Sequence, residues 1–173
     1  ELHLLAKLMR GLGSENVDYR LRHADFANSA AAGKARWLGL PIAALSTLQR
    51  VLVVGSFLRK DHPLFAQRIR QAARKGAQVH SVGALADDWA MTVGTRVIAA
   101  PSDWLQSLAD IAAAIAAAKG VSAPASGNAS AEAKAIADSL LSGERKAVLL
   151  GNAAAQHPQA GGLLALANWI AAQ

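Results

Sequence analysis

The sequence predicts an α/β protein with a doubly wound, mostly parallel open sheet that carries helices on both faces, as in Rossmann-like folds. Two short aliphatic runs, 51–54 and 147–150, have the pattern of strands buried on both sides. Segments with helical periodicity alternate with such runs along the chain. A length of 173 residues, with 53% hydrophobic and 17% charged residues, is typical of an ordered domain with its own core.

The first 50 residues hold one clear helix and a loop region. Leucines recur at helical spacing over 2–11, and Gly11 favours a helix end there. Over 16–36 charged and then small residues replace this pattern, which indicates a loop with at most a short strand. Pro41 suits the first turn of a short helix that ends near Leu48.

The clearest unit is a strand, a helix and a second strand. After the strand 51–54, Asp61 suits the N-cap of a helix and Pro63 suits its first turn. The sequence Arg-Lys-Gly at 74–76 matches a helix C-terminus, where cations and glycine are favoured. A strand follows at 78–82. We expect a right-handed crossover between the two parallel strands.

The same alternation continues more faintly to the end of the chain. The later elements are a strand at 95–99, a helix capped by Ser102 or Asp103 and running to about 118, a helix over 131–141, a strand at 147–150 and a helix over 162–172.

The domain organisation follows from composition. Residues 120–130 are small and polar with one proline, which predicts a linker. We therefore predict an α/β region over 1–119 and a further α/β segment of the same or an adjoining lobe over 131–173. The chain opens on glutamate without a basic leader, and we expect it to be an excerpt of a longer protein.

Composition excludes several classes of site. With no cysteine, the chain holds no disulfide, thiolate zinc site, cysteine-ligated iron–sulfur cluster or cysteine nucleophile. The net charge of +6 is concentrated in the first half, but no aromatic-and-basic recognition motif accompanies it, so nucleic-acid binding is disfavoured. The longest apolar stretch, 111–118, is too short to span a bilayer.

The candidate ligand site lies after two predicted strands, in the loops 55–62 and 151–158. In open α/β sheets, ligands bind outside the carboxyl ends of the strands. Gly55 allows a sharp turn, Ser56 supplies a hydroxyl group, and Arg59 suits a phosphate at a helix N-terminus. An ordinary solvated connection is the alternative, because neither loop carries a dinucleotide or Walker glycine pattern.

No catalytic constellation emerges from the residues. The five histidines lack the spacing of a helical zinc site, so packing or surface roles are favoured for each. Asp87 and Asp88 are adjacent, which favours a solvated loop over an acid/base pair. No serine lies in a nucleophile elbow. We predict no metal site and no catalytic residue in this chain.

Two segments carry a family resemblance. ENVDYRLRHADF (15–26) and RVLVVGSFLRKDHPLFAQRIRQAARKGAQ (50–78) resemble the large iron–sulfur subunit of bacterial NADH-quinone oxidoreductase, respiratory complex I, whose C-terminal part belongs to the molybdopterin oxidoreductase superfamily. The likeness runs over the whole chain and is strongest in 1–80. It implies a molybdopterin-oxidoreductase-like α/β fold.

The resemblance also implies site residues. In the molybdenum enzymes a strand-Gly loop ending in His-Pro helps to hold the pterin, and it corresponds here to Gly55, Ser56, His62 and Pro63, with Phe57 at the usual asparagine position. We take these four residues, together with Arg59, as candidate cofactor-binding residues that are vestigial if the chemistry is lost.

The metal-ligand motif of the formate-dehydrogenase-like members is incomplete in this chain. Matching it on Asn16, Asp18 and Arg22 leaves Ala24 where the metal ligand should stand and Asp25 where histidine should stand. An alanine methyl group cannot coordinate molybdenum.

The resemblance therefore implies a cofactor-free structural scaffold within a complex that passes electrons from NADH to quinone. Its iron–sulfur clusters would lie outside these residues, and its partners would be other subunits of the peripheral arm, on the cytoplasmic side of the bacterial inner membrane. The alternative is a functional molybdopterin- or nucleotide-binding oxidoreductase domain. A third candidate is the middle domain of thiamine-diphosphate-type enzymes, which rests only on the generic strand, loop and helix of 146–173.

Overall fold

The structure, a computed structural model, describes residues 2–17 and 38–173. Most of the loop region predicted over 16–36 therefore lies outside the described residues, as do Asp18, Arg22, Ala24 and Asp25 of the incomplete metal-ligand motif.

Within the described ranges, a four-stranded, all-parallel sheet forms the centre of the fold, with strand order β3-β2-β1-β4. Its aliphatic central strand, β1, lies between β2 and β4, and Val51 aligns with Val79 on one side and with Ala147 on the other. The prediction of a parallel open sheet is confirmed. The strands are β1 (Arg50–Val54), β2 (Gln78–Gly83), β3 (Arg96–Ile98) and β4 (Lys146–Leu150).

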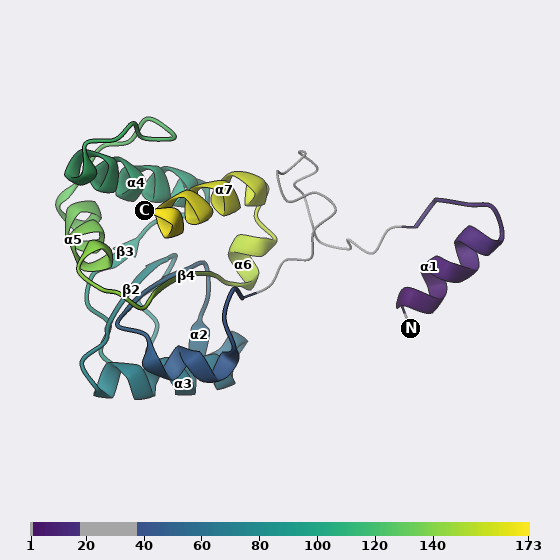
Figure 1. The fold of residues 1–173 in the computed structure, drawn as a ribbon, viewed down its shortest axis with the longest axis horizontal. Coiled ribbons are helices and arrows are strands. Elements are labelled where there is room, and N and C mark those ends of the chain that lie inside the picture. Colours follow the sequence, from purple (N-terminus) through teal and green to yellow (C-terminus); the bar gives the residue numbers. More distant parts are fainter. Residues whose placement is uncertain (1, 18–37) are drawn as a thin grey trace.

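Helices cover both faces of this sheet (Figure 1). Side chains alternate between the faces of a strand, so Val51 and Val53 point to one face while Leu52 and Val54 point to the other. The first face packs against the 3₁₀ helix η1 (Ile42–Thr47) and α3 (Pro63–Arg74), and the second against α4 (Trp104–Lys119), α5 (Ala131–Leu141) and α7 (Ala160–Ala172).

The side chains predicted to cap two helices make no capping hydrogen bond. Asp61 ends a short extra helix, α2 (Leu58–Asp61), and its carboxylate accepts hydrogen bonds from the turn before α2 instead of capping α3. The 3₁₀ turn η2 (Pro101–Asp103) precedes α4, and no described side chain caps that helix. Asp61 lies one residue before His62, the N-cap of α3. Asp103 occupies the N-cap position of α4, but its carboxylate accepts a hydrogen bond from the Ser102 hydroxyl instead of from a helix N–H.

The final third of the chain shares the sheet and the core. Ser130 caps α5 by accepting a hydrogen bond from the N–H of Ala133. Helix α5 packs against α4, and β4 pairs with β1 along its whole length. Between α4 and α5, the exposed segment 120–130 is tied down where the N–H of Asn128 donates to Asp110 on α4. The short helix α6 (Asn152–Ala155) follows β4.

Helix α1 (Leu2–Gly11) agrees with the predicted amphipathic helix, but its apolar side chains are exposed. Leu8 is 58% exposed and Leu12, just beyond the helix, is 72% exposed. Among the described helices, none combines the length and the apolar character needed to cross a bilayer.

Candidate functional site

The two loops singled out in the sequence meet at the carboxyl ends of β1 and β4. The N–H of Gly151 donates to the carbonyl of Val54 at 2.8 Å, and the N–H of Ala153 donates to the carbonyl of Gly55 at 3.1 Å. This contact follows from the strand order, because the ends of neighbouring parallel strands lie at the same edge of a sheet.

Glycine is required at both positions where these loops touch. Gly55 has φ +62, and a Cβ there would lie 2.7 Å from the Trp104 ring and 2.7 Å from the Ala154 nitrogen. A Cβ on Gly151 would lie 2.6 Å from the Gly55 carbonyl oxygen and would also overlap Ser56. The space between the loops is therefore filled by the chain itself.

The hydroxyl group of Ser56 is engaged within its own loop. It donates to the carboxylate of Asp61 at 2.8 Å, and the same carboxylate oxygen accepts the N–H of Phe57 at 3.0 Å. These two bonds fold residues 56–61 into a closed turn. A ligand that used the Ser56 hydroxyl as a donor would first have to displace Asp61.

The guanidinium group of Arg59 is paired with a carboxylate. Its Nη1 lies 2.9 Å from Asp88 Oδ2, and it also lies over the Phe57 ring, 5.8 Å from the centroid. The backbone N–H of Ala90 and then the charge of Arg59 hold the pKa of Asp88 below its ordinary value. Asp88 thus remains ionised at neutral pH and neutralises the cation that the sequence suggested as a phosphate ligand.

His62 and Pro63 form the start of α3. The imidazole ring of His62 is partly buried and stacks on Phe65 at 5.4 Å, and Pro63 occupies the first helical position. As arranged, the side chains of this loop do not fit a pterin without rearrangement, because Ser56 and Arg59 already have internal partners. Cofactor binding by Gly55, Ser56, Arg59, His62 and Pro63 stays a prediction.

The structure gives His157 a fixed packing role that the sequence did not specify. The N–H of Gln159 donates to its Nδ1 at 3.0 Å, so Nε2 carries the proton and donates to the carbonyl of Pro101 at 2.9 Å. The ring is buried beside Trp104, with centroids 6.0 Å apart. These contacts hold the turn before α7 against the start of α4.

A second buried histidine lies inside the sheet. The N–H of Thr95 donates to His80 Nδ1 at 3.1 Å, so Nε2 donates to the hydroxyl group of Ser139 at 2.8 Å. Ser139 in turn donates to the amide oxygen of Gln78 at 2.7 Å. Burial, and to a lesser extent the charge of Arg50, lowers the pKa of His80. A polar pair, His-Ser, inside a buried strand was the sequence signal for this network.

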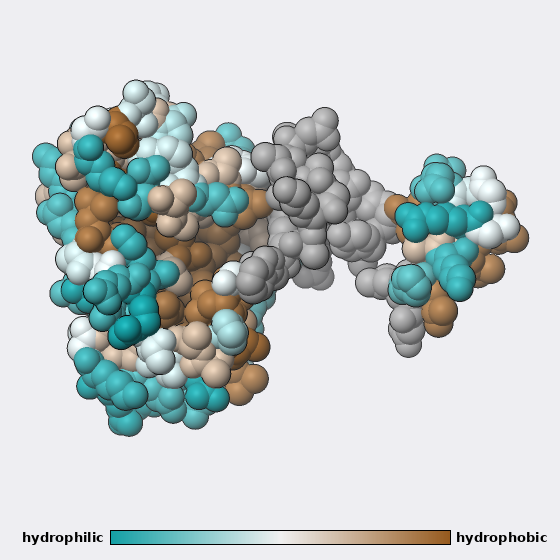
Figure 2. Space-filling view, in the orientation of Figure 1, coloured by the Kyte–Doolittle hydropathy of each residue, from teal (hydrophilic) through white to brown (hydrophobic). Residues whose placement is uncertain are grey.

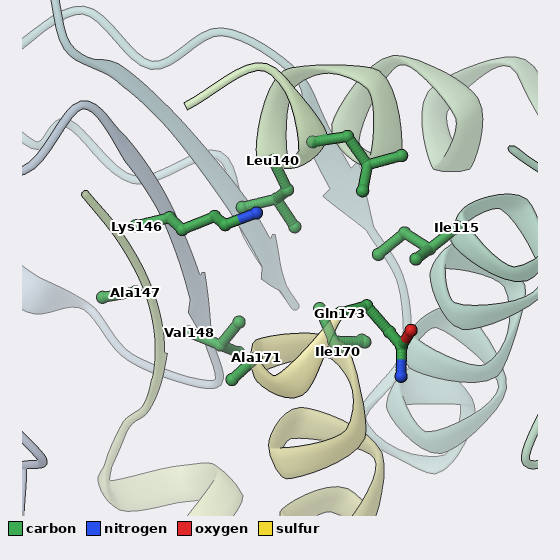
Figure 3. A pocket seen from close by; sticks show the side chains of 9 residues that line it. Ile115, Leu140, Lys146, Ala147, Val148, Ile170, Ala171 and Gln173 are labelled. Carbon is green, nitrogen blue, oxygen red and sulfur yellow. The ribbon is translucent and has the colours of Figure 1, made fainter. Parts of the chain in front are cut away.

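Among the cavities elsewhere in the described part of the chain, two bear on ligand binding. One is apolar, has a volume of about 30 Å³ and opens between α4, α5, β4 and α7, where Leu140, Ile115 and Ile170 surround it (Figure 3). That volume holds about one water molecule, so the cavity takes no cofactor. Apolar surface is visible in the recess beside β4 and α7 (Figure 2). The second cavity is a polar groove of about 460 Å³ at the amino ends of the strands.

The described residues contain no cluster of histidine, aspartate and glutamate side chains that could hold a metal ion. No curated protein matches the chain. The family model of the molybdopterin oxidoreductases matches residues 1–172, which is nearly the whole chain, and the parallel α/β sheet is consistent with it. The chain therefore belongs to the molybdopterin oxidoreductase family.

Proposed function

We propose that this chain is a structural part of a larger oxidoreductase and holds no redox group itself. Family membership supports an oxidoreductase-type function. The observation that carries the scaffold role is the internal pairing of the candidate ligand loop, in which Ser56 is bonded to Asp61 and Arg59 to Asp88. The apolar ring of Phe57 also supports the scaffold role, because the family pattern has an amide side chain at that position.

Cofactor analysis of the purified full chain tests this proposal. Elemental analysis, an absorbance scan and mass spectrometry of released small molecules should find molybdenum, tungsten, pterin and nucleotide at far below one per chain. Circular dichroism of the same sample should show the folded α/β spectrum, so that absence of a cofactor is not absence of a fold. A stoichiometric pterin or nucleotide in the folded protein would overturn the scaffold role.

Within this role, the finer proposal is the molybdopterin-like region of the large iron–sulfur subunit of NADH-quinone oxidoreductase. This proposal rests on the resemblance of segments 15–26 and 50–78. Under it, the partners of the chain are other subunits of the peripheral arm, at the cytoplasmic face of the bacterial inner membrane. A tagged full-length parent protein should co-purify with iron–sulfur subunits and with NADH oxidation activity. Isolation of the parent with a different set of redox subunits would overturn this assignment and leave the scaffold role intact.

One observation favours the alternative of a ligand-binding oxidoreductase domain. The Gly55 and Gly151 loops lie side by side at the carboxyl edge of the sheet, where open α/β folds bind their ligands. If this alternative holds, Asp61→Ala should free the Ser56 hydroxyl and raise the amount of pterin or nucleotide bound. Asp103→Ala is the matched control, because that exposed aspartate begins α4 without capping it.

A further inference from the structure

A polar groove at the amino ends of the strands has no role in the site described above. It lies between η1, the end of α3 and the turn before β4, at the opposite edge of the sheet from the Gly55 loop. Its volume of about 460 Å³ falls in the range of small-molecule sites. None of the described aromatic side chains lines it, so it offers no surface there on which a nucleobase could stack.

Of the described side chains, three cations and no carboxylate line this groove. Arg50 comes from the start of β1, Lys75 from the end of α3 and Arg145 from the residue before β4. In the part of the chain that the structure describes, the ion pairs join other residues, Arg10 to Glu15 and Arg59 to Asp88. The positive charge of the groove is therefore not neutralised by a neighbouring described side chain.

Hydrogen bonds hold the two guanidinium groups in place. Arg145 Nε donates to the carbonyl of Thr47 at 2.7 Å, while Arg50 donates from Nε to the Ser142 hydroxyl at 3.0 Å and from Nη1 to the Gln49 carbonyl at 2.8 Å. Both terminal nitrogens of Arg145 and the ammonium group of Lys75 keep donors without an acceptor among the described residues. A fixed guanidinium fork loses little entropy when it binds an oxyanion.

The C-terminal end of α3 also faces the groove, and its partial negative charge opposes an anion. That partial charge is about half an elementary charge. The N–H groups of Lys75, Gly76 and Ala77 already bond the last carbonyls of the helix, at Ala72 and Ala73. The three full positive charges of the groove outweigh the partial negative charge of the helix end. The positive charge of Arg50 also acts inside the sheet, where it contributes, after burial, to the lowered pKa of His80.

We propose that this groove binds a small phosphate-bearing anion, held by the guanidinium groups of Arg50 and Arg145 and the ammonium group of Lys75. Guanidinium groups match the oxygens of phosphate in a bidentate manner, and Lys75 adds a point charge. The concave shape favours a small molecule over an extended acidic polypeptide. This site is independent of the proposed scaffold role, because it shares no residue with the Gly55 loop.

Isothermal titration of the full chain with inorganic pyrophosphate at low salt tests the proposal. We expect saturable binding with one site per chain, weakened at least tenfold by Lys75→Gln. Arg74→Gln is the matched control, since Arg74 is exposed on the same helix, carries the same charge and does not line the groove. It should change the affinity by less than twofold. The Lys75 ammonium group has no hydrogen-bond acceptor among the described residues, so the Lys75→Gln variant should fold normally.

Arg145→Gln should weaken pyrophosphate binding to a similar extent, with an unchanged circular dichroism spectrum as the check on its fold. Absence of saturable binding, or equal weakening by Arg74→Gln and Lys75→Gln, would overturn the proposal, because the second result would show only general charge attraction. A short polyglutamate peptide that binds through Lys75 more tightly than pyrophosphate would also overturn it and would make the groove a protein-docking surface.

Discussion

His80 shows how one buried polar residue ties three elements together. It joins β2 to the residue before β3 through Thr95 and to α5 through Ser139. Because both ring nitrogens are engaged in the neutral form, protonation of Nδ1 would break the bond from Thr95 and place a charge inside the sheet. The residue therefore makes the fold sensitive to acid.

Acidification should destabilise the protein through this residue. The pKa of His80 is lowered from 6.5 in the folded state, so below about pH 6.5 the unfolded chain takes up a proton that the folded chain refuses. The stability is fully present above that pH and is lost as the pH falls towards the folded pKa. We expect a loss of at most about 1.4 kcal/mol per pH unit from this group.

Urea unfolding between pH 7 and pH 5 measures this dependence. His80→Gln should flatten it, whereas the same substitution at the exposed His3 is the comparison for a general effect of losing a histidine. An unchanged slope in His80→Gln would show that another group controls the acid sensitivity.

Gly151 is a second residue whose surroundings determine the effect of a substitution. Gly151→Ala should lower the free energy of unfolding by about 1–3 kcal/mol, because the added methyl group overlaps Ser56 and the Gly55 carbonyl. Gly83→Ala is the matched control, since a Cβ at that position, the end of β2, lies 3.9 Å from its nearest neighbour. Chemical unfolding should separate the two variants. Equal stability would mean that the loops move apart without cost.

Among the helices, α1 and α5 differ sharply in what they bury. Ile136 on α5 is fully buried, whereas Leu8 on α1 is 58% exposed. We expect Ile136→Ala to cost about 2–5 kcal/mol in unfolding free energy and Leu8→Ala to cost less than about 0.5 kcal/mol. Thermal or urea unfolding checks both. A large effect at Leu8 would show that α1 packs on the body of the protein.

The regular elements could be predicted because each has a local signal. The aliphatic run of β1 and the Arg-Lys-Gly end of α3 both stand in the sequence, and the structure contains them. The short helices α2 and α6 could not be foreseen, because a four-residue helix has no periodicity and depends on its tertiary contacts.

The candidate site was less predictable than the fold. The sequence located the Gly55 and Gly151 loops at one edge, since strand ends in a parallel sheet follow from topology. The sequence could not show that Asp61 accepts a hydrogen bond from Ser56 or that Asp88 forms an ion pair with Arg59, because such contacts between side chains are visible only in the structure. The polar groove was missed for the same reason: its three cations come from segments that are far apart in the chain.

At the scale of the whole molecule, residues 131–173 complete the core that residues 38–119 begin. Without them, β1 loses its partner β4, and the face of the sheet under α5 and α7 is uncovered. A chain ending at 130 should therefore lack a cooperative unfolding transition, whereas the full chain should unfold in one. Differential scanning calorimetry of both measures this. A sharp transition in the shorter chain would show that residues 1–130 form a folding unit that does not need 131–173.

The central position of β1 also constrains the order in which the chain folds. Its pairing with β2 needs only the α3 crossover, but 92 residues separate Arg50 from Ser142, which it bonds just before β4 begins. Contacts over such a separation form slowly because closing a long loop costs entropy. During synthesis, the edge of β1 that pairs with β4 therefore stays unpaired until β4 has left the ribosome. A chain that stalls before residue 146 exposes this aliphatic strand edge, which is prone to aggregation.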